Sequence, residues 1–186
     1  MSVLVLAAAR EELGDLEGEV VGVGPIVSGI RTAALLEARR PERVVLIGSA
    51  GTYEGRVPIG AAVASGRLGI SWGVAALGLG YVPRPPESLL GDPEMLELLQ
   101  LPARDVLTVG AITTDAGLAA RLGDGWAVEH MESFAVAYAC HNVGVPFVAV
   151  LGITNDVGPD AHVQWLAHRA AAHRAAQQAI LPLLTA

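Results

Sequence analysis

The sequence predicts a three-layer α/β/α fold, in which a central β-sheet is covered by helices on both faces. Three observations support this prediction: 52% of the 186 residues are hydrophobic, only 17% are charged, and apolar runs alternate along the chain with segments of helical period. A chain of this length and composition can bury one substantial core. We therefore expect a single domain over residues 1–186.

Six apolar runs bounded by glycine and proline are predicted to be buried strands, because strands covered on both faces read as near-continuous apolar runs. They are Val3–Ala9, Val20–Val23, Arg43–Ile47, Ala61–Ala64, Val106–Ala111 and Phe147–Leu151. Five segments with helical period are predicted helices. They are Ser28–Arg40, Pro93–Leu99, Thr114–Leu122, Met131–Asn142 and the Ala-rich Ala161–Leu184. The run Pro83-Arg84-Pro85-Pro86 resists both helix and central strand, which predicts an exposed loop or flap.

The charge balance excludes several classes of partner. A formal charge of −7 repels phosphate backbones and anionic lipids, so we expect neither nucleic acid nor membrane as a partner. All twelve basic residues are arginine, which excludes a Schiff-base lysine and the lysine of a phosphate-binding P-loop. The single cysteine, Cys140, and the lack of basic residues before the first apolar run predict a cytoplasmic protein.

Two segments near the N-terminus are candidate ligand sites. Glu11 and Glu12 follow the first predicted strand, at the end where α/β sheets place ligands. Alternatively, they are only solvated acids favoured by a helix dipole. The glycine-rich run from Gly22 to Gly29 is a weak signal for NAD, because Pro25 removes an amide donor and no acid ends the next strand.

Three further segments combine a buried element with polar or small residues. In Gly48-Ser49-Ala50-Gly51, a strand breaks into small residues, which predicts either a tight turn or a close backbone approach to a ligand. Glu132 opens an apolar helix between Met131 and Phe134, so its carboxylate needs a partner such as a sugar hydroxyl. We interpret His130 as a local hydrogen-bonding group.

The last predicted strand delivers Thr154, Asn155 and Asp156 together at its carboxyl end. Such a cluster is typical of a ligand site, and equally of an Asx-type turn leading into a loop.

The order and spacing of these segments, together with the lead Cys140-His141-Asn142-Val143-Gly144-Val145-Pro146-Phe147, resemble the nucleoside phosphorylase/nucleosidase family. The resemblance spans nearly the whole chain. It is greatest with the hydrolytic branch that contains futalosine hydrolases and methylthioadenosine nucleosidases. It implies a phosphorylase/hydrolase-like fold with a central mixed sheet, and cleavage of the N-glycosidic bond of a purine nucleoside.

The resemblance also implies roles for particular residues. Glu12 would position the attacking water, Glu132 would bind the ribose hydroxyls and Met131 would pack against the sugar. Asn155 falls where methylthioadenosine nucleosidases carry the aspartate that protonates the purine, and Asp156 next to it is an alternative. The remaining substrate contacts would come from Ser49, Ala50, Gly51, Ile112 and Phe134, with Trp72 and Tyr81 as further candidates for an apolar 5′ pocket.

The base is predicted from Asn155. A 6-oxopurine presents two acceptors, O6 and N7, so an amide donor suits hypoxanthine better than adenine. The run Thr154-Asn155-Asp156-Val157-Gly158-Pro159-Asp160 followed by Trp165 also resembles futalosine hydrolases. Futalosine, an inosine derivative of the route to menaquinone, is therefore the expected substrate. A methylthioadenosine/S-adenosylhomocysteine nucleosidase is the alternative.

Water is expected to be the nucleophile, because Ile47 stands where phosphorylases of the family carry a phosphate-binding arginine. Arg10 and Arg31 are the residues that could still contact phosphate, so a purine nucleoside phosphorylase stays open. We expect no cofactor and no metal, because no His/Cys cluster has ligand spacing. The chain is shorter in its middle than typical family members, which leaves a non-catalytic nucleoside-binding protein as a further alternative. We expect a homodimer or higher homo-oligomer.

Overall fold

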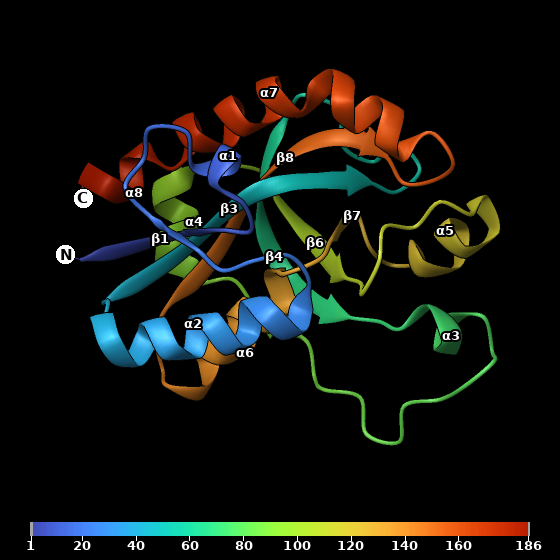
Figure 1. The fold of residues 1–186 in the computed structure, drawn as a ribbon, viewed down its shortest axis with the longest axis horizontal. Helices are drawn as coiled ribbons and strands as arrows, with labels where there is room; N and C mark the ends of the chain where they lie inside the picture. Colours follow the sequence, from blue (N-terminus) through green and yellow to red (C-terminus); the bar gives the residue numbers. More distant parts are fainter. Residues whose placement is uncertain (1, 186) are drawn as a thin grey trace.

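The computed structural model describes residues 2–185 and shows one mixed β-sheet between two layers of helices (Figure 1). The strands are β1 (Val3–Ala7), β2 (Glu19–Val20), β3 (Arg43–Thr52), β4 (Ala62–Ile70), β5 (Leu89–Leu90), β6 (Ala103–Thr108), β7 (Val128–His130) and β8 (Phe147–Asp156). The helices are α1 (Arg10–Leu13), α2 (Pro25–Arg39), α3 (Gly73–Ala76), α4 (Pro93–Leu99), α5 (Ala116–Leu122), α6 (Ser133–Asn142), α7 (Ala161–Ala179) and α8 (Leu181–Thr185).

The sheet has the order β2-β1-β3-β7-β6-β4-β5, and β8 bridges β3 and β4. Strands β1, β3 and β8 run parallel in that order, in a register that pairs Ala7 with Ile47 and Ile47 with Val150. Because β3, β7, β6, β4 and β8 are each paired with the next, this half of the sheet closes on itself. Because β1, β3 and β8 are parallel, their carboxyl ends lie at the same edge of the sheet.

Alternate residues of the central strands enter two separate cores. On β3, Val44 and Leu46 face the core beneath α2 and α6, whereas Val45 and Ile47 face the core beneath α4, α7 and α8. This alternation is what the two-residue period of a strand produces when both faces are covered. Figure 1 shows α7 on one side of the sheet and the α2–α6 pair on the other. The predicted three-layer architecture with a mixed sheet is confirmed.

Several boundaries differ from those expected. Of the two alternatives for Gly48–Gly51, the tight turn is wrong, because β3 continues to Thr52 alongside β8, which likewise runs on to Asp156. The strand β7 was not predicted, and α6 begins two residues later than expected. Helix α2 begins at Pro25, whose fixed φ and missing N–H suit the first helical turn.

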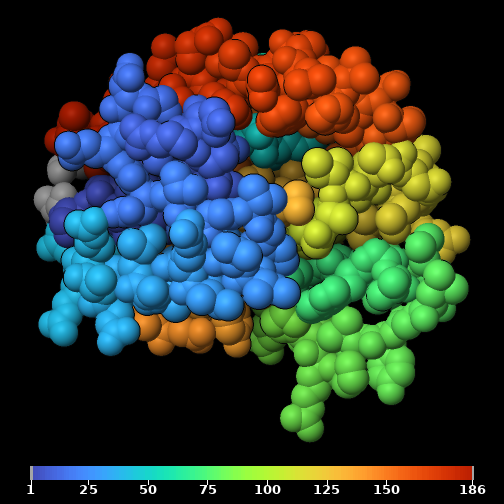
Figure 2. Space-filling view, viewed as in Figure 1, coloured from blue at the N-terminus to red at the C-terminus, as the bar shows by residue number. Residues whose placement is uncertain are grey.

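The segment between β4 and β5 projects from the body of the molecule, as the green region of Figure 2 shows. The prediction of an exposed proline-rich loop is confirmed, because Pro83, Arg84, Pro85 and Pro86 lie outside any helix or strand and are all exposed. Among the helices of residues 2–185, none is long and apolar enough to cross a membrane.

Gly152 on β8 is predicted to be essential for packing against α7, because a Cβ there would lie 2.1 Å from the Ala172 carbonyl oxygen. We expect Gly152→Ala to lower the free energy of unfolding by about 1–3 kcal/mol and Tm by roughly 2–10 °C. Thermal melting measured by circular dichroism checks this. Gly110→Ala is the matched control, since a Cβ at Gly110 meets nothing within 4 Å; equal melting of the two variants would contradict the packing assignment.

Candidate active site

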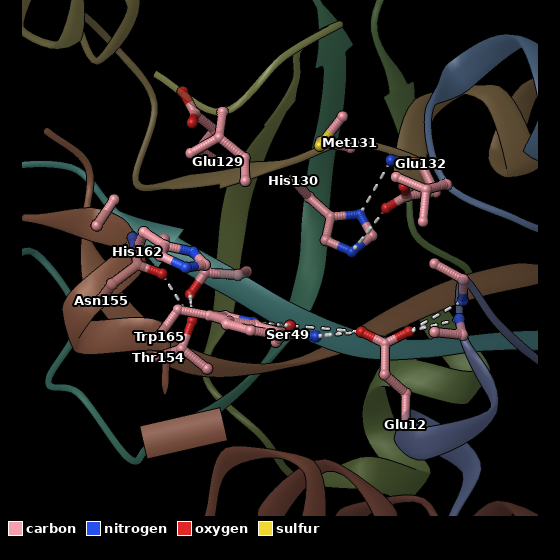
Figure 3. A pocket seen from close by; sticks show the side chains of 17 residues that line it. Glu12, Ser49, Glu129, His130, Met131, Glu132, Thr154, Asn155, His162 and Trp165 are labelled. Atoms are coloured by element: carbon pink, nitrogen blue, oxygen red, sulfur yellow. Dashed lines mark hydrogen bonds and ion pairs between the residues drawn. The ribbon is translucent and has the colours of Figure 1, made fainter. Parts of the chain in front are cut away.

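A pocket of about 330 Å³ opens at the carboxyl edge of β1, β3 and β8 and is closed on one side by the segment from Glu129 to Glu132 (Figure 3). Its volume falls within the range of small-molecule sites. It is lined by Ala8, Ala9, Glu12, Val23, Ser49, Ala50, Gly51, Ile112, Glu129, His130, Met131, Glu132, Thr154, Asn155, Ala161, His162 and Trp165.

Glu12 places a buried carboxylate on this pocket from the short helix α1. Its Oε2 accepts hydrogen bonds from the backbone N–H groups of Ala8 (3.0 Å) and Ala9 (3.1 Å), and its Oε1 accepts one from the N–H of Ser49 (3.0 Å). A carboxylate offers about four lone-pair sites. These three amides fix the position of the side chain. Burial nevertheless raises the pKa of Glu12 above its ordinary value, and His130 and the backbone amides only partly oppose this rise.

Ser49 is itself held by Trp165 of α7. The Trp165 indole Nε1 donates to the Ser49 Oγ at 3.1 Å, and that oxygen lies 3.4 Å from Oε1 of Glu12. His162 stacks on the indole, with ring centroids 5.9 Å apart. Helix α7 therefore supplies one wall of the pocket and orients the hydroxyl next to the Glu12 carboxylate.

Glu132 provides the second buried carboxylate. Its Oε1 accepts a hydrogen bond from the N–H of Gly24 at 2.7 Å, and its Oε2 lies 3.2 Å from Nε2 of His130. Its side chain is only 4% exposed. Burial raises the pKa of Glu132 to about 7, although the amides of Gly24 and Met131 act in the opposite direction.

Glu129 is a third acidic side chain at the pocket, and it accepts three hydrogen bonds from Tyr53 and Thr113. Tyr53 Oη donates to its Oε2 at 2.7 Å, and the backbone N–H and hydroxyl of Thr113 donate at 3.1 and 2.7 Å. Burial raises the pKa of the Tyr53 phenol, and the Glu129 carboxylate raises it further. Glu129 therefore anchors the loop that carries Ile112 to the rim of the pocket.

Asn155 presents an amide whose orientation is fixed by its neighbours. Its Nδ2 lies 2.9 Å from the carbonyl oxygen of Asp156, which can only accept, and its Oδ1 lies 2.7 Å from the Thr154 hydroxyl. The amide nitrogen carries two hydrogens. One is used by this carbonyl, and the other is free to donate to a ligand.

Eight of the ten site residues predicted from the sequence line the pocket together. They are Glu12, Ser49, Ala50, Gly51, Ile112, Met131, Glu132 and Asn155. Asp156 does not line it, because it is exposed at the end of β8, where its backbone N–H donates to Gln164 of α7. Phe134 does not line it either, because it stacks on Tyr138 within the core beneath α6. Trp72 and Tyr81 are 41% and 85% exposed and also lie outside the pocket-lining set.

Several residues of the pocket wall were not predicted from the sequence. Glu129 and His162 were not proposed as site residues, Thr154 was noted only as part of a polar cluster, and His130 was given only a local role. The sequence did contain a signal for Glu129 and His130. Together with Glu132 they place three titratable side chains within four residues of a stretch that is otherwise apolar. His162 comes from a helix whose polar face gave no such signal, and Trp165 was noted only through the resemblance of its loop.

The pocket lining contains no positively charged side chain among residues 2–185. Arg10 donates to the carbonyl of Gly14, Arg31 donates to that of Val20, and neither reaches the pocket. Ile47 is fully buried in the core. In the same part of the chain, no group of three or more His, Cys, Asp or Glu side chains is arranged to hold a metal ion.

Comparison with known proteins places the chain in a family. The model of the phosphorylase superfamily matches residues 17–185, so the chain belongs to that superfamily. Two similar relatives are the 5′-methylthioadenosine/S-adenosylhomocysteine nucleosidases of Bacillus subtilis and Chromohalobacter salexigens. The first is 27% identical over 82% of this chain and 75% of its own length. The second is 28% identical over 87% of this chain and 79% of its own length.

Solved structures share the fold. The 5′-methylthioadenosine/S-adenosylhomocysteine nucleosidase of Colwellia psychrerythraea, solved with adenine, superposes with a TM-score of 0.85 at 19% identity over 100% of this chain and 96% of its own. The futalosine hydrolase of Helicobacter pylori also superposes with a TM-score of 0.85, at 16% identity over 98% and 97% of the two chains.

The raised pKa of Glu132 predicts a pH-dependent cost in stability. A carboxyl whose pKa rises from 4.5 to about 7 on folding binds its proton more tightly in the folded state. Its contribution to stability is therefore present below pH 4.5 and is lost as the pH rises towards 7. We expect Glu132→Gln to remove this loss, so that the stability of the variant relative to the natural protein increases between pH 5 and pH 8.

Urea denaturation of both proteins at the two pH values measures this difference. Because Glu12 titrates in both proteins, only the change in their difference is informative. A difference in unfolding free energy that is the same at pH 5 and pH 8 would show that Glu132 titrates as an ordinary carboxyl.

Proposed function

We propose that this protein hydrolyses the N-glycosidic bond of a purine nucleoside. One observation carries the proposal: two buried carboxylates, Glu12 and Glu132, share a pocket with the donor amide of Asn155, and the residues described as lining it include no cation. Carboxylates suit water activation and sugar hydroxyls, whereas a phosphate nucleophile requires arginine or several free amides. Membership of the phosphorylase superfamily and relatives named as nucleosidases support the same reaction.

In the proposed mechanism, Glu12 accepts a proton from a water molecule as the water oxygen attacks the anomeric carbon. The C–N bond breaks, and its electron pair leaves with the purine, so that positive charge develops on the ribose ring. The departing purine anion takes up a proton from solvent, and Glu12 returns its proton to solvent, so that free purine and free sugar are the products. The raised pKa of Glu12 makes it a stronger base than an ordinary carboxylate. Glu132 accepts hydrogen bonds from the ribose hydroxyls, and Met131 packs against the sugar.

Asn155 supports a 6-oxopurine as the base, with futalosine as the preferred substrate. Its free Nδ2 hydrogen can be donated to O6 or N7 of hypoxanthine, which are both acceptors. The amide cannot transfer a proton to N7, as a carboxylic acid could. It stabilises the departing base through a hydrogen bond, an effect typically worth about 10²-fold or more.

An adenine nucleoside is the second candidate substrate, favoured by the names of the relatives that match in sequence. A substrate panel separates the two. Purified protein is incubated with futalosine, inosine and methylthioadenosine, and free hypoxanthine and adenine are followed by chromatography. Hypoxanthine from futalosine with the highest kcat/KM supports the proposed substrate. Adenine from methylthioadenosine as the dominant product contradicts the interpretation of Asn155, and no product from any substrate contradicts the hydrolase.

Replacing the proposed base tests the role of Glu12. We expect Glu12→Gln to lower kcat by about 10²-fold or more, because the amide cannot accept a proton from water. The circular dichroism spectrum should stay unchanged. The matched control is Glu11→Gln, since Glu11 is the exposed neighbour in the same helix. If Glu12→Gln turned over substrate as fast as Glu11→Gln, the assignment of water activation to Glu12 would be wrong.

Restoring a carboxyl at position 155 tests the specificity. We expect Asn155→Asp to lower the ratio of kcat/KM for inosine to that for methylthioadenosine by about 10-fold or more, because a carboxylate repels O6 while an acid can protonate N7. Asn142→Asp makes the same chemical change at an exposed position near the end of α6. An unchanged ratio in Asn155→Asp would remove Asn155 from base recognition.

A further inference from the structure

The buried side chain of His130 lies between the two carboxylates of the pocket, and its protonation is fixed by the start of α6 (Figure 3). Its Nδ1 lies 3.2 Å from the backbone nitrogen of Glu132 and 3.1 Å from that of Ser133. Backbone N–H groups can only donate. Nδ1 must therefore carry a lone pair, and the proton of the neutral imidazole must be on Nε2.

This arrangement replaces an ordinary helix cap. Glu132 occupies the N-cap position of α6 but makes no side-chain hydrogen bond to the first turn, because its carboxylate points into the pocket. The first amides of a helix need acceptors. The imidazole of His130 supplies one, and the Ser133 hydroxyl lies 2.8 Å from the same nitrogen. The cap thus leaves Glu132 free for the ligand.

The other side of the ring faces acidic groups. Nε2 lies 3.2 Å from Oε2 of Glu132, so a proton on Nε2 faces that carboxylate. Glu12 lies on the same side: a Cβ on Gly48 would lie 3.1 Å from His130 Nε2 and 3.2 Å from Glu12 Oε1. Glycine at position 48 therefore allows the imidazole and the Glu12 carboxylate to converge above β3.

The charged groups around the ring do not make it cationic. The facing groups are the carboxylates of Glu132 and Glu12, and protonation would direct a new Nδ1–H at two backbone N–H groups. Burial lowers the pKa of His130 to about 4, and the Glu12 carboxylate only partly opposes this. The imidazole stays neutral while the carboxylates titrate.

We propose that His130 is a positioning residue: its neutral imidazole, locked with the proton on Nε2, holds the Glu132 carboxylate in place for the ribose hydroxyls. This inference depends on the proposed function for the identity of the ligand. The tautomer follows from the hydrogen bonds alone. His130 thereby acts at two places: its Nδ1 accepts from the start of α6, and its Nε2 faces the Glu132 carboxylate.

Nuclear magnetic resonance tests the tautomer without any substrate. Long-range ¹H–¹⁵N spectra of the ligand-free protein at neutral pH should show the His130 ring protonated at Nε2 only. A ring protonated at Nδ1, or at both nitrogens, would overturn the proposal. This result stands even if the protein releases no base from any nucleoside, an outcome that would count against the proposed function alone.

Two substitutions separate positioning from capping. In His130→Asn the side-chain oxygen can stand near Nδ1 and cap α6, but the Nε2–H donor is lost. In His130→Gln the amide nitrogen can reach the position of Nε2 and keep the donor. We expect His130→Asn to lower kcat/KM by about 10- to 100-fold, the range for loss of a hydrogen bond to a charged group, and His130→Gln to recover part of this loss.

The pH profile gives a readout that a purely structural role would not change. Without the Nε2–H donor, the ionised form of Glu132 is less stable, so the acid limb of kcat/KM in His130→Asn should move to higher pH. Carbon-13 titration of the Glu132 carboxyl should show the same upward shift without turnover. His141→Asn, at an exposed position of α6, is the control. If His130→Asn is folded and matches this control in kcat/KM and Glu132 titration, His130 does not position the carboxylate.

Discussion

The site depends on the hydrogen bonds that three backbone amides donate to the Glu12 carboxylate. A buried carboxylate is costly unless its lone pairs are satisfied, and Ala8, Ala9 and Ser49 satisfy three of them. The parallel pairing of β1 with β3 brings these amides to the same edge of the sheet. The register between β1 and β3 is therefore the constraint that fixes the position of the Glu12 carboxylate.

The electrostatics of the pocket follow from the same arrangement. Glu12 and Glu132 are buried at one pocket, and the residues described as lining it include neither lysine nor arginine. Such a site stabilises positive charge developing on a ribose ring and repels a phosphate dianion. Burial raises the pKa values of both carboxyls, because removal from water disfavours their ionised forms. His130 faces Glu132 at 3.2 Å with a neutral imidazole, so it brings no cation into the pocket that would attract phosphate.

Local patterns in the sequence were sufficient to predict the alternating layers, and Glu12, Glu132 and Asn155 are on the pocket wall as expected. The features that could not be predicted depend on strand pairing between distant segments and on the residue at which a helix or strand begins or ends. Strand β7 has three residues, two of them polar, and it exists only because it pairs with both β3 and β6. Phe134 was misplaced because α6 begins at Ser133 and points the ring into the core.

Asp156 was misplaced for a comparable reason, since β8 runs on through Asn155 and leaves Asp156 exposed at the end of the strand, where its backbone N–H donates to Gln164 of α7. His162 and Trp165 are brought to the site by the docking of α7, which no local pattern specifies. The single-domain organisation and the expected homo-oligomer stay predictions.

We propose that water, and not phosphate, attacks the sugar in a pocket lined by carboxylates. The most direct test measures the initial rate of purine release in phosphate-free buffer and again with phosphate added, and identifies the sugar product by mass spectrometry. A rate that is independent of phosphate, with a free sugar as product, is the predicted result. Release that begins only when phosphate is added, with a sugar phosphate as product, would contradict it.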